Sequence, residues 1–220
     1  MDNTEESYVV SFMHGTSGSF ISTIVWRIIN EQDEGVLLTQ KNSAHLESPW
    51  EQSWHHPEYG DCNTPNLFTG LSFDKIGLVK THVYPDYDQL RSALPNTKLV
   101  LIIMDDADIL EVAWNCIKKS DDENESVTVE EVQRNLTYLY EHQLGAAEYE
   151  YFWKFCDPSI VPEDLKSRVL LIKYRDIYKE QGDSFTALEQ IKTFTGREAS
   201  LAVLDSYRTY VTNRNKIWNK

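Results

Sequence analysis

Short apolar runs alternate along the chain with segments of helical periodicity. The runs are rich in Val, Leu, Ile and aromatic residues and cover residues 8–13, 76–80, 98–104 and 168–174. Continuous apolar runs of this length are typical of strands that are buried on both faces of a sheet. The run at 98–104, KLVLIIM, is the most strand-like and is expected at the centre.

Apolar residues recur at helical spacing between and after these runs. Helices are predicted over residues 20–29, 86–94, 107–119, 185–194 and 199–211, with further helical segments between 128 and 157. Gly196 is expected to stop the helix at 185–194, and a basic, asparagine-rich tail follows the last helix. The alternation predicts an α/β protein: a three-layer, P-loop-like fold with a central parallel sheet flanked by helices. We expect a single domain over residues 1–220.

Composition excludes several function classes. The formal net charge of −14 disfavours nucleic acid and anionic membranes as partners, because the field of the whole molecule would repel both. We recognise neither a signal peptide nor an apolar run long enough to span a bilayer. The three cysteines are scattered without metal-ligand spacing. Together these features predict reduced thiols and a cytoplasmic location.

The first strand and the first helix are joined by a small, polar loop, His14-Gly15-Thr16-Ser17-Gly18-Ser19. Its two glycines can adopt positive φ, and the first amides of the following helix lack intrahelical acceptors. The helix dipole adds a preference for negative charge there, so the loop is a candidate phosphate-binding loop. An ordinary tight turn is the alternative. No Lys-Ser or Lys-Thr follows the second glycine, so this is not a Walker A loop.

Polar residues also follow the other predicted strands, as Lys80-Thr81-His82, Asp105-Asp106 and Tyr174-Arg175-Asp176. Ligands of open parallel sheets bind outside the carboxyl ends of the strands. These groups are therefore expected at one edge of the sheet, together with the first loop.

The segment at 41–69 lacks periodicity and is expected to be a long binding loop. It contains His45, His55 and His56, but their spacing is not that of metal ligands. No metal site is predicted.

Several of these segments resemble the sulfotransferases in order and spacing. They are the first strand–loop–helix unit, IGLVKTHVYPDYDQL, KLVLIIMDDADILEVAW, and RVLLIKYRDIYKE with ALEQIKTFTG. Lys80-Thr81-His82 matches the Lys-Thr-His of the cytosolic branch, in which the His is the general base. The resemblance implies transfer of a sulfuryl group from 3′-phosphoadenosine 5′-phosphosulfate (PAPS) to a hydroxyl or amine of a small-molecule or glycan acceptor.

The resemblance also implies roles for individual residues. His82 and Lys80 are the implied catalytic residues. The implied PAPS-binding residues are Gly15, Thr16, Ser17, Gly18, Ser19, Phe20, Arg214 and Lys216.

The chain departs from the family pattern at three positions. Thr16 replaces the loop lysine, Met104 precedes two carboxylates where the family has an arginine, and Val112 stands in place of a serine. Loss of a bidentate guanidinium contact and the added repulsion predict weak affinity for the 3′-phosphorylated nucleotide.

Two other function classes remain open. One is a nucleoside or small-molecule kinase, in which Asp105 or Asp106 would hold magnesium at a central strand end. The missing Walker lysine argues against it. The other is a catalytically inactive relative that serves as a nucleotide-binding or assembly module.

Overall fold

The computed structural model describes residues 7–12, 16–31, 78–81, 84–85, 87–92, 95–105, 108, 112, 155–156 and 161–218. For residues 79–81, 89 and 214–218 it describes the backbone alone. The predictions for the loop at 41–69 and for the helical segments between 128 and 157 lie almost entirely outside these residues. The single-domain assignment stays a prediction for the same reason.

Four parallel strands form one sheet in the order β2-β1-β3-β4. They are β1 (Ser7–Ser11), β2 (Leu78–Thr81), β3 (Thr97–Ile103) and β4 (Val169–Lys173). All described residues of β1 are buried, as are all but one of β3, because helices cover both faces of the sheet. This confirms the predicted α/β class with a central parallel sheet flanked by helices.

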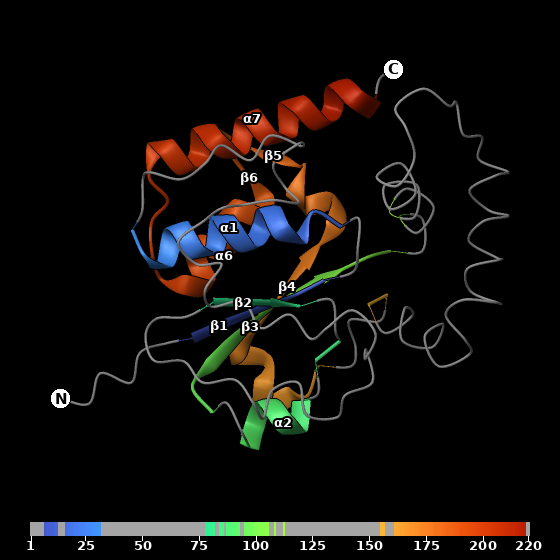
Figure 1. Cartoon of the computed structure of the whole chain (residues 1–220), viewed down its shortest axis with the longest axis vertical. Coiled ribbons are helices and arrows are strands. Elements are labelled where there is room, and N and C mark those ends of the chain that lie inside the picture. The colour runs from blue at the N-terminus through green and yellow to red at the C-terminus, as the bar shows by residue number, and fades with distance from the viewer. Residues whose placement is uncertain are drawn as a thin grey trace, which may run out of the picture.

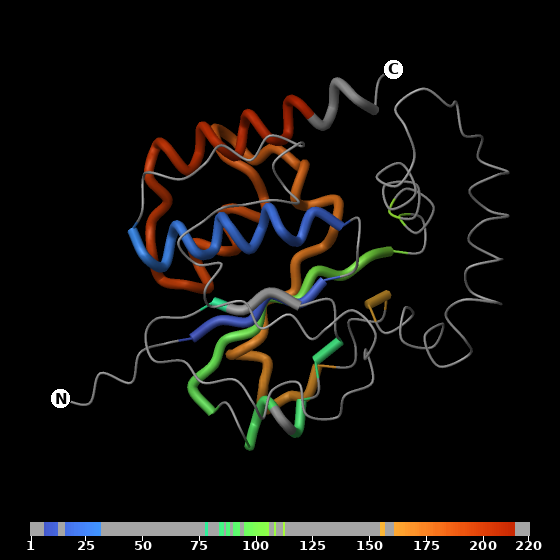
Figure 2. Tube along the Cα trace, viewed as in Figure 1, coloured from blue at the N-terminus to red at the C-terminus, as the bar shows by residue number. Residues whose placement is uncertain are grey.

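One face of the sheet is covered by α1 (Gly18–Ile29) and α6 (Thr186–Thr195). The last helix, α7 (Leu201–Trp218), lies outside these two and extends past the first turn of α1 (Figures 1 and 2). On the opposite side of the sheet lie the short helix α2 (Tyr87–Ser92) and the 3₁₀ segment η5 (Glu163–Arg168) (Figure 1). No helix in the described part of the chain is both long enough and apolar enough to cross a membrane.

Helix α6 ends where the sequence predicts. Gly196 adopts a left-handed conformation with φ 69°, and its amide donates to the Lys192 carbonyl oxygen at 2.9 Å. A left-handed residue at this position satisfies a carbonyl that the helix itself leaves without a donor. The apolar periodicity and the glycine together thus define this helix correctly.

Two segments differ from the prediction. Helix α7 continues to Trp218, so the basic segment expected to be a tail is helical. Its lysine and arginine residues have good helix propensity, and no Gly or Pro interrupts it. The second difference is a hairpin of β5 (Glu180–Gln181) and β6 (Ser184–Phe185), with Gly182 left-handed between them.

Arg168 links α2 to the sheet. It was expected at the start of the fourth strand, but it ends η5 instead. Its Nη2 donates to the carbonyl oxygens of Thr97 at 2.9 Å and Leu90 at 3.2 Å, and Nε donates to Thr97 at 3.2 Å. Partial burial lowers its pKa. One guanidinium therefore satisfies carbonyls at the start of β3 and near the end of α2.

We expect Arg168→Met to lower the free energy of unfolding by about 1–3 kcal/mol, because two carbonyl groups lose their donor. Urea denaturation followed by circular dichroism measures this change. Lys166→Met is the matched control, since Lys166 forms an exposed pair with Glu163 and its loss should cost less than ~0.5 kcal/mol. Equal effects of the two substitutions would contradict this role for Arg168.

Candidate anion-binding site

The strand order makes the carboxyl end of β1 a topological switch point. Among the described strands, β2 lies on one side of β1 and β3 on the other. Chain connections diverge at such a point, and ligands of open α/β sheets bind just outside it. The residues that leave β1 here are Phe12 and, after the segment 13–15, Thr16 and Ser17.

Ser17 adopts an unusual backbone conformation at the start of α1. It is the N-cap residue and is left-handed, with φ 62° and ψ 22°. Gly18 follows in the helical conformation. A left-handed residue followed by a right-handed one turns successive backbone amides toward a common point, which forms an anion-binding concavity. The first backbone bond of the helix runs from Ile21 N to the Ser17 oxygen at 3.1 Å, so the amides before Ile21 precede the helical ladder.

Gly18 is required for a different reason from the one the sequence suggests. The expectation was that Gly18 supplies positive φ, but Ser17 does so instead. A Cβ on Gly18 would lie 1.8 Å from Cγ of the Phe12 ring. Only a glycine therefore allows the start of α1 to pack this closely on the end of β1. Gly15 lies outside the described residues.

Two tyrosines hold the Ser17 side chain. Tyr210 OH donates to Ser17 Oγ at 2.8 Å, and the Tyr178 hydroxyl lies 2.5 Å from the same oxygen. Tyr178 follows the 3₁₀ segment η6 (Tyr174–Ile177) at the end of β4, and Tyr210 comes from α7. The loop between β1 and α1 is thus tied to two distant parts of the chain.

The side chains of Thr16 and Phe20 are buried, so these two residues could contact an anion only through their backbone amides. Thr16 is fully buried, and Phe20 is 2% exposed. The Phe20 ring stacks face to face on Tyr210, with ring centroids 3.7 Å apart and planes within 6°. The Phe20 ring is therefore part of the core. If Phe20 binds PAPS as predicted, it does so through its backbone amide.

The backbone of Lys80 and Thr81, from the predicted catalytic segment, lies beside the end of β1, from which the loop starts. Lys80 pairs with Val10 and Thr81 pairs with Ser11 in the parallel register of β2 and β1. Lys80 is therefore inside the strand, and the chain leaves the sheet after Thr81 at the same edge as the loop. His82 lies outside the described residues, so its role stays a prediction.

The two predicted cations of the C-terminal region, Arg214 and Lys216, belong to α7. Arg214 comes one helical turn after Tyr210, which means about 6 Å further along the helix axis. Because Tyr210 contacts Ser17, this turn brings the backbone of the basic segment toward the start of α1. Their contacts with a nucleotide stay predictions.

The carboxylates at the end of β3 are paired with cations. Lys173 Nζ lies 3.3 Å from Asp105 Oδ1, and both side chains are about half exposed. Asp108 is buried, accepts from the Asp105 amide at 3.1 Å and forms an ion pair with Arg175. Met104 is 1% exposed, whereas Asp105, the next residue, is exposed. Asp106 lies outside the described residues.

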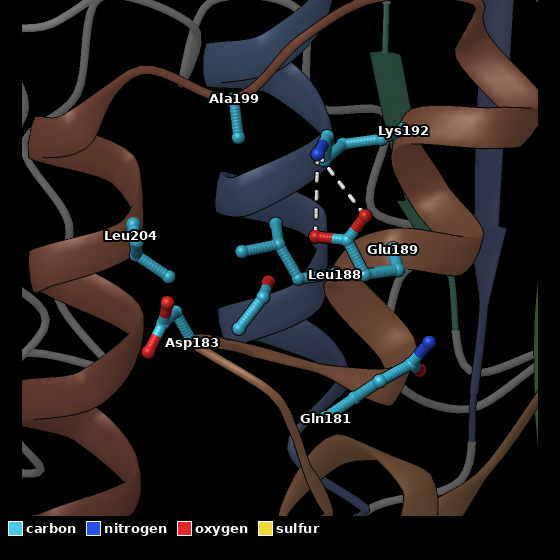
Figure 3. Close-up of a pocket in the computed structure, with 8 residues that line it drawn as sticks. Gln181, Asp183, Leu188, Glu189, Lys192, Ala199 and Leu204 are labelled. Carbon is cyan, nitrogen blue, oxygen red and sulfur yellow. Dashed lines mark hydrogen bonds and ion pairs between the residues drawn. The ribbon is translucent and has the colours of Figure 1, made fainter.

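A separate cavity of about 380 Å³ lies between the β5–β6 hairpin, α6 and α7 (Figure 3). Its floor is apolar, and its polar groups include Glu189, whose carboxylate accepts from Lys192 Nζ at 3.0 Å. The Ser184 hydroxyl and then Lys192 lower the pKa of Glu189. Among the described residues, Ser184 Oγ is buried and has no partner that meets hydrogen-bond geometry. None of the predicted site residues lines this cavity.

Neither tyrosine was predicted from the sequence. Tyr178 and Tyr210 lie 161 and 193 residues after Ser17, and their spacing carries no local signal. The prediction that strand ends meet at one edge did place the Tyr174-Arg175-Asp176 segment near the loop. This segment begins four residues before Tyr178.

Comparisons with known proteins give limited information. No family model matches the chain, and no curated protein matches it. A structure of retinol dehydratase in complex with androsterone and the inactive cofactor PAP aligns with a TM-score of 0.49 and 14% identity, over 94% of this chain. A second structure, retinol dehydratase with retinol and PAP, aligns with a TM-score of 0.42 and 13% identity, over 96% of this chain. The chain spans 64% of the length of each. Likeness at this level establishes no family, so the sulfotransferase assignment rests on the motifs.

We expect Gly18→Ala to destabilise the protein by about 1–3 kcal/mol, because the new methyl group overlaps the Phe12 ring. Thermal unfolding measures this cost. Combining it with Phe12→Ala tests the cause, because the atoms that the methyl group would overlap are Cγ, Cδ1 and Cδ2 of Phe12, and alanine lacks all three. The cost of Gly18→Ala should then fall to less than half. An unchanged cost in the Phe12→Ala background would show that the contact is not responsible.

Proposed function

We propose that this chain is a sulfotransferase-like protein that binds PAPS at the start of α1. It transfers the sulfuryl group to a hydroxyl or amine of a small-molecule or glycan acceptor. The observation that carries the proposal is the left-handed Ser17 followed by helical Gly18, at the carboxyl end of a central parallel strand. This geometry suits a phosphate or sulfate group. The Lys-Thr-His motif beside it supports sulfuryl transfer over other anion chemistry.

The donor is held mainly by backbone groups in this proposal. The amides from Ser17 to Phe20 donate to the 5′-phosphosulfate, and the positive end of the α1 dipole favours its charge. Arg214 and Lys216, one to two turns beyond Tyr210 on α7, bind the 3′-phosphate. This local arrangement offsets the overall charge of −14, which would otherwise repel the nucleotide.

Transfer needs one base and stabilisation of the leaving group. The acceptor oxygen or nitrogen attacks sulfur and forms the new bond, while His82 takes the proton from the acceptor. The bond between sulfur and the bridging phosphate oxygen breaks, and adenosine 3′,5′-bisphosphate leaves with that electron pair. Lys80 and the loop amides stabilise the negative charge that develops on the leaving phosphate.

The kinase alternative requires Asp105 or Asp106 to hold magnesium at the end of β3. Asp105 is paired with Lys173, whereas Asp106 lies outside the described residues. The missing Walker lysine remains the argument against a kinase.

Isothermal titration calorimetry with adenosine 3′,5′-bisphosphate and with ATP plus magnesium tests the proposal. We expect the bisphosphate to bind and ATP with magnesium not to bind. The missing arginine contact should weaken the affinity by about ten- to a hundredfold relative to an intact site. Binding of ATP with magnesium but not of the bisphosphate would favour the kinase. Binding of neither nucleotide would favour an assembly module.

His82→Ala should lower turnover by about 10²–10⁴, while the affinity for adenosine 3′,5′-bisphosphate stays nearly unchanged, because a base acts in proton transfer. Transfer from ³⁵S-labelled PAPS to a panel of alcohols, phenols and amines measures this. A protonated imidazole cannot accept a proton, so wild-type turnover should fall as the pH drops below about 6.5. This acid limb should vanish in His82→Ala.

Lys80→Ala should lower both turnover and donor affinity, because Lys80 contacts the transferring group in this proposal. Full activity of His82→Ala would contradict the assignment of the base.

A further inference from the structure

The side chain of Ser17 does not act as the cap that its position would suggest. A serine at the N-cap usually accepts a hydrogen bond from an amide in the first turn of the helix. Ser17 makes no such bond, and its hydroxyl contacts Tyr178 and Tyr210 instead. The Ser17 oxygen therefore does not occupy the acceptor position in front of the first turn of α1.

The backbone of Ser17 is also unfavourable for a residue with a side chain. A left-handed conformation brings Cβ too close to the carbonyl oxygen, so glycine adopts it far more readily than serine. Among the described residues, Glu31 is the only other non-glycine residue with positive φ. Contacts that favour this conformation must therefore offset its cost.

The two tyrosines are well placed to do so because their rings are fixed. Tyr210 is 5% exposed, and its ring stacks on Phe20 from α1 itself. The Tyr178 ring packs edge-on against buried Tyr174, with centroids 5.4 Å apart. Their hydroxyl groups are thus held in place by core packing, and the Ser17 hydroxyl must come to them.

We propose that Tyr178 and Tyr210 are positioning residues for the anion-binding loop. By bonding the Ser17 hydroxyl, they keep Ser17 left-handed, turn its amide and that of Gly18 toward the anion, and keep the serine oxygen out of the anion's place. This inference rests on the proposed function for its ligand. It adds two residues, from the end of β4 and from α7, to the determinants of donor affinity.

The test uses the double variant Tyr178→Phe/Tyr210→Phe, which keeps both rings and removes both hydroxyl groups. We expect it to bind adenosine 3′,5′-bisphosphate about 5- to 30-fold more weakly than the wild type, measured by calorimetry. The same two changes in a Ser17→Gly background should alter affinity by less than about twofold, because glycine adopts positive φ without support.

Tyr207→Phe is the matched control on the same helix. Tyr207 OH donates to the Ile177 carbonyl oxygen at 2.9 Å and does not contact Ser17. This variant should lose stability but keep its affinity. If the two tyrosine changes lower affinity equally in the wild-type and Ser17→Gly backgrounds, their role is a general structural one and the inference is overturned. The inference is also overturned if they lower affinity in neither background.

A crystal structure of the double variant separates this inference from the proposed function. If the wild type does not bind the nucleotide, the proposed function fails, but the conformation of Ser17 still tests the role of the tyrosines. We expect Ser17 to leave the left-handed region and to bond an amide of the first helical turn. A Ser17 that stays left-handed without the two hydroxyl groups would overturn the inference.

Discussion

The hydroxyl of Ser17 is the point at which three distant parts of the chain meet. Ser17 lies between β1 and α1, Tyr178 lies just beyond β4, and Tyr210 lies in the last helix. The bond of 2.5 Å to Tyr178 fixes where α1 begins relative to the end of β4, and the bond of 2.8 Å to Tyr210 fixes it relative to α7. Stacking of Phe20, in the first turn of α1, on Tyr210 reinforces the contact with α7. The shape of the candidate site depends on this contact.

The close approach of β1 and α1 has a second cause, which is the absence of a side chain at Gly18. The Phe12 ring lies where a Cβ would be, so strand and helix are joined with no space between them. Tight packing below the loop and hydrogen bonding beside it fix the backbone at the start of α1. In the proposed function, this backbone binds the anion through its amides, which compensates in part for Thr16 at the position of the family's loop lysine.

Two described carboxylates that follow β3 are paired with cations: Asp105 with Lys173, and Asp108 with Arg175. The exposed pair of Asp105 and Lys173 contributes little stability, because water and salt screen it. In the proposed function, its effect is local: Lys173 reduces the repulsion between Asp105 and the nucleotide.

The elements that follow from local pattern could be predicted from the sequence, whereas those that depend on distant contacts could not. The apolar run of β3 and the periodicity of α6 with Gly196 gave the right elements, and their alternation gave the fold class. The left-handed Ser17 was not predictable from local pattern, and the tyrosines that bond its hydroxyl lie more than 160 residues away. Gly18 was identified correctly as important, but its reason is a contact with Phe12 that no spacing rule contains.

The most direct test of this account is a crystal structure of the protein with adenosine 3′,5′-bisphosphate. We predict that the 5′-phosphate lies within hydrogen-bonding distance of the amides of Gly18 and Ser19, with Ser17 left-handed and bonded to Tyr178 and Tyr210. The 3′-phosphate is predicted to lie near Arg214 or Lys216. A nucleotide bound elsewhere, for example in the cavity between α6 and α7, would contradict the account.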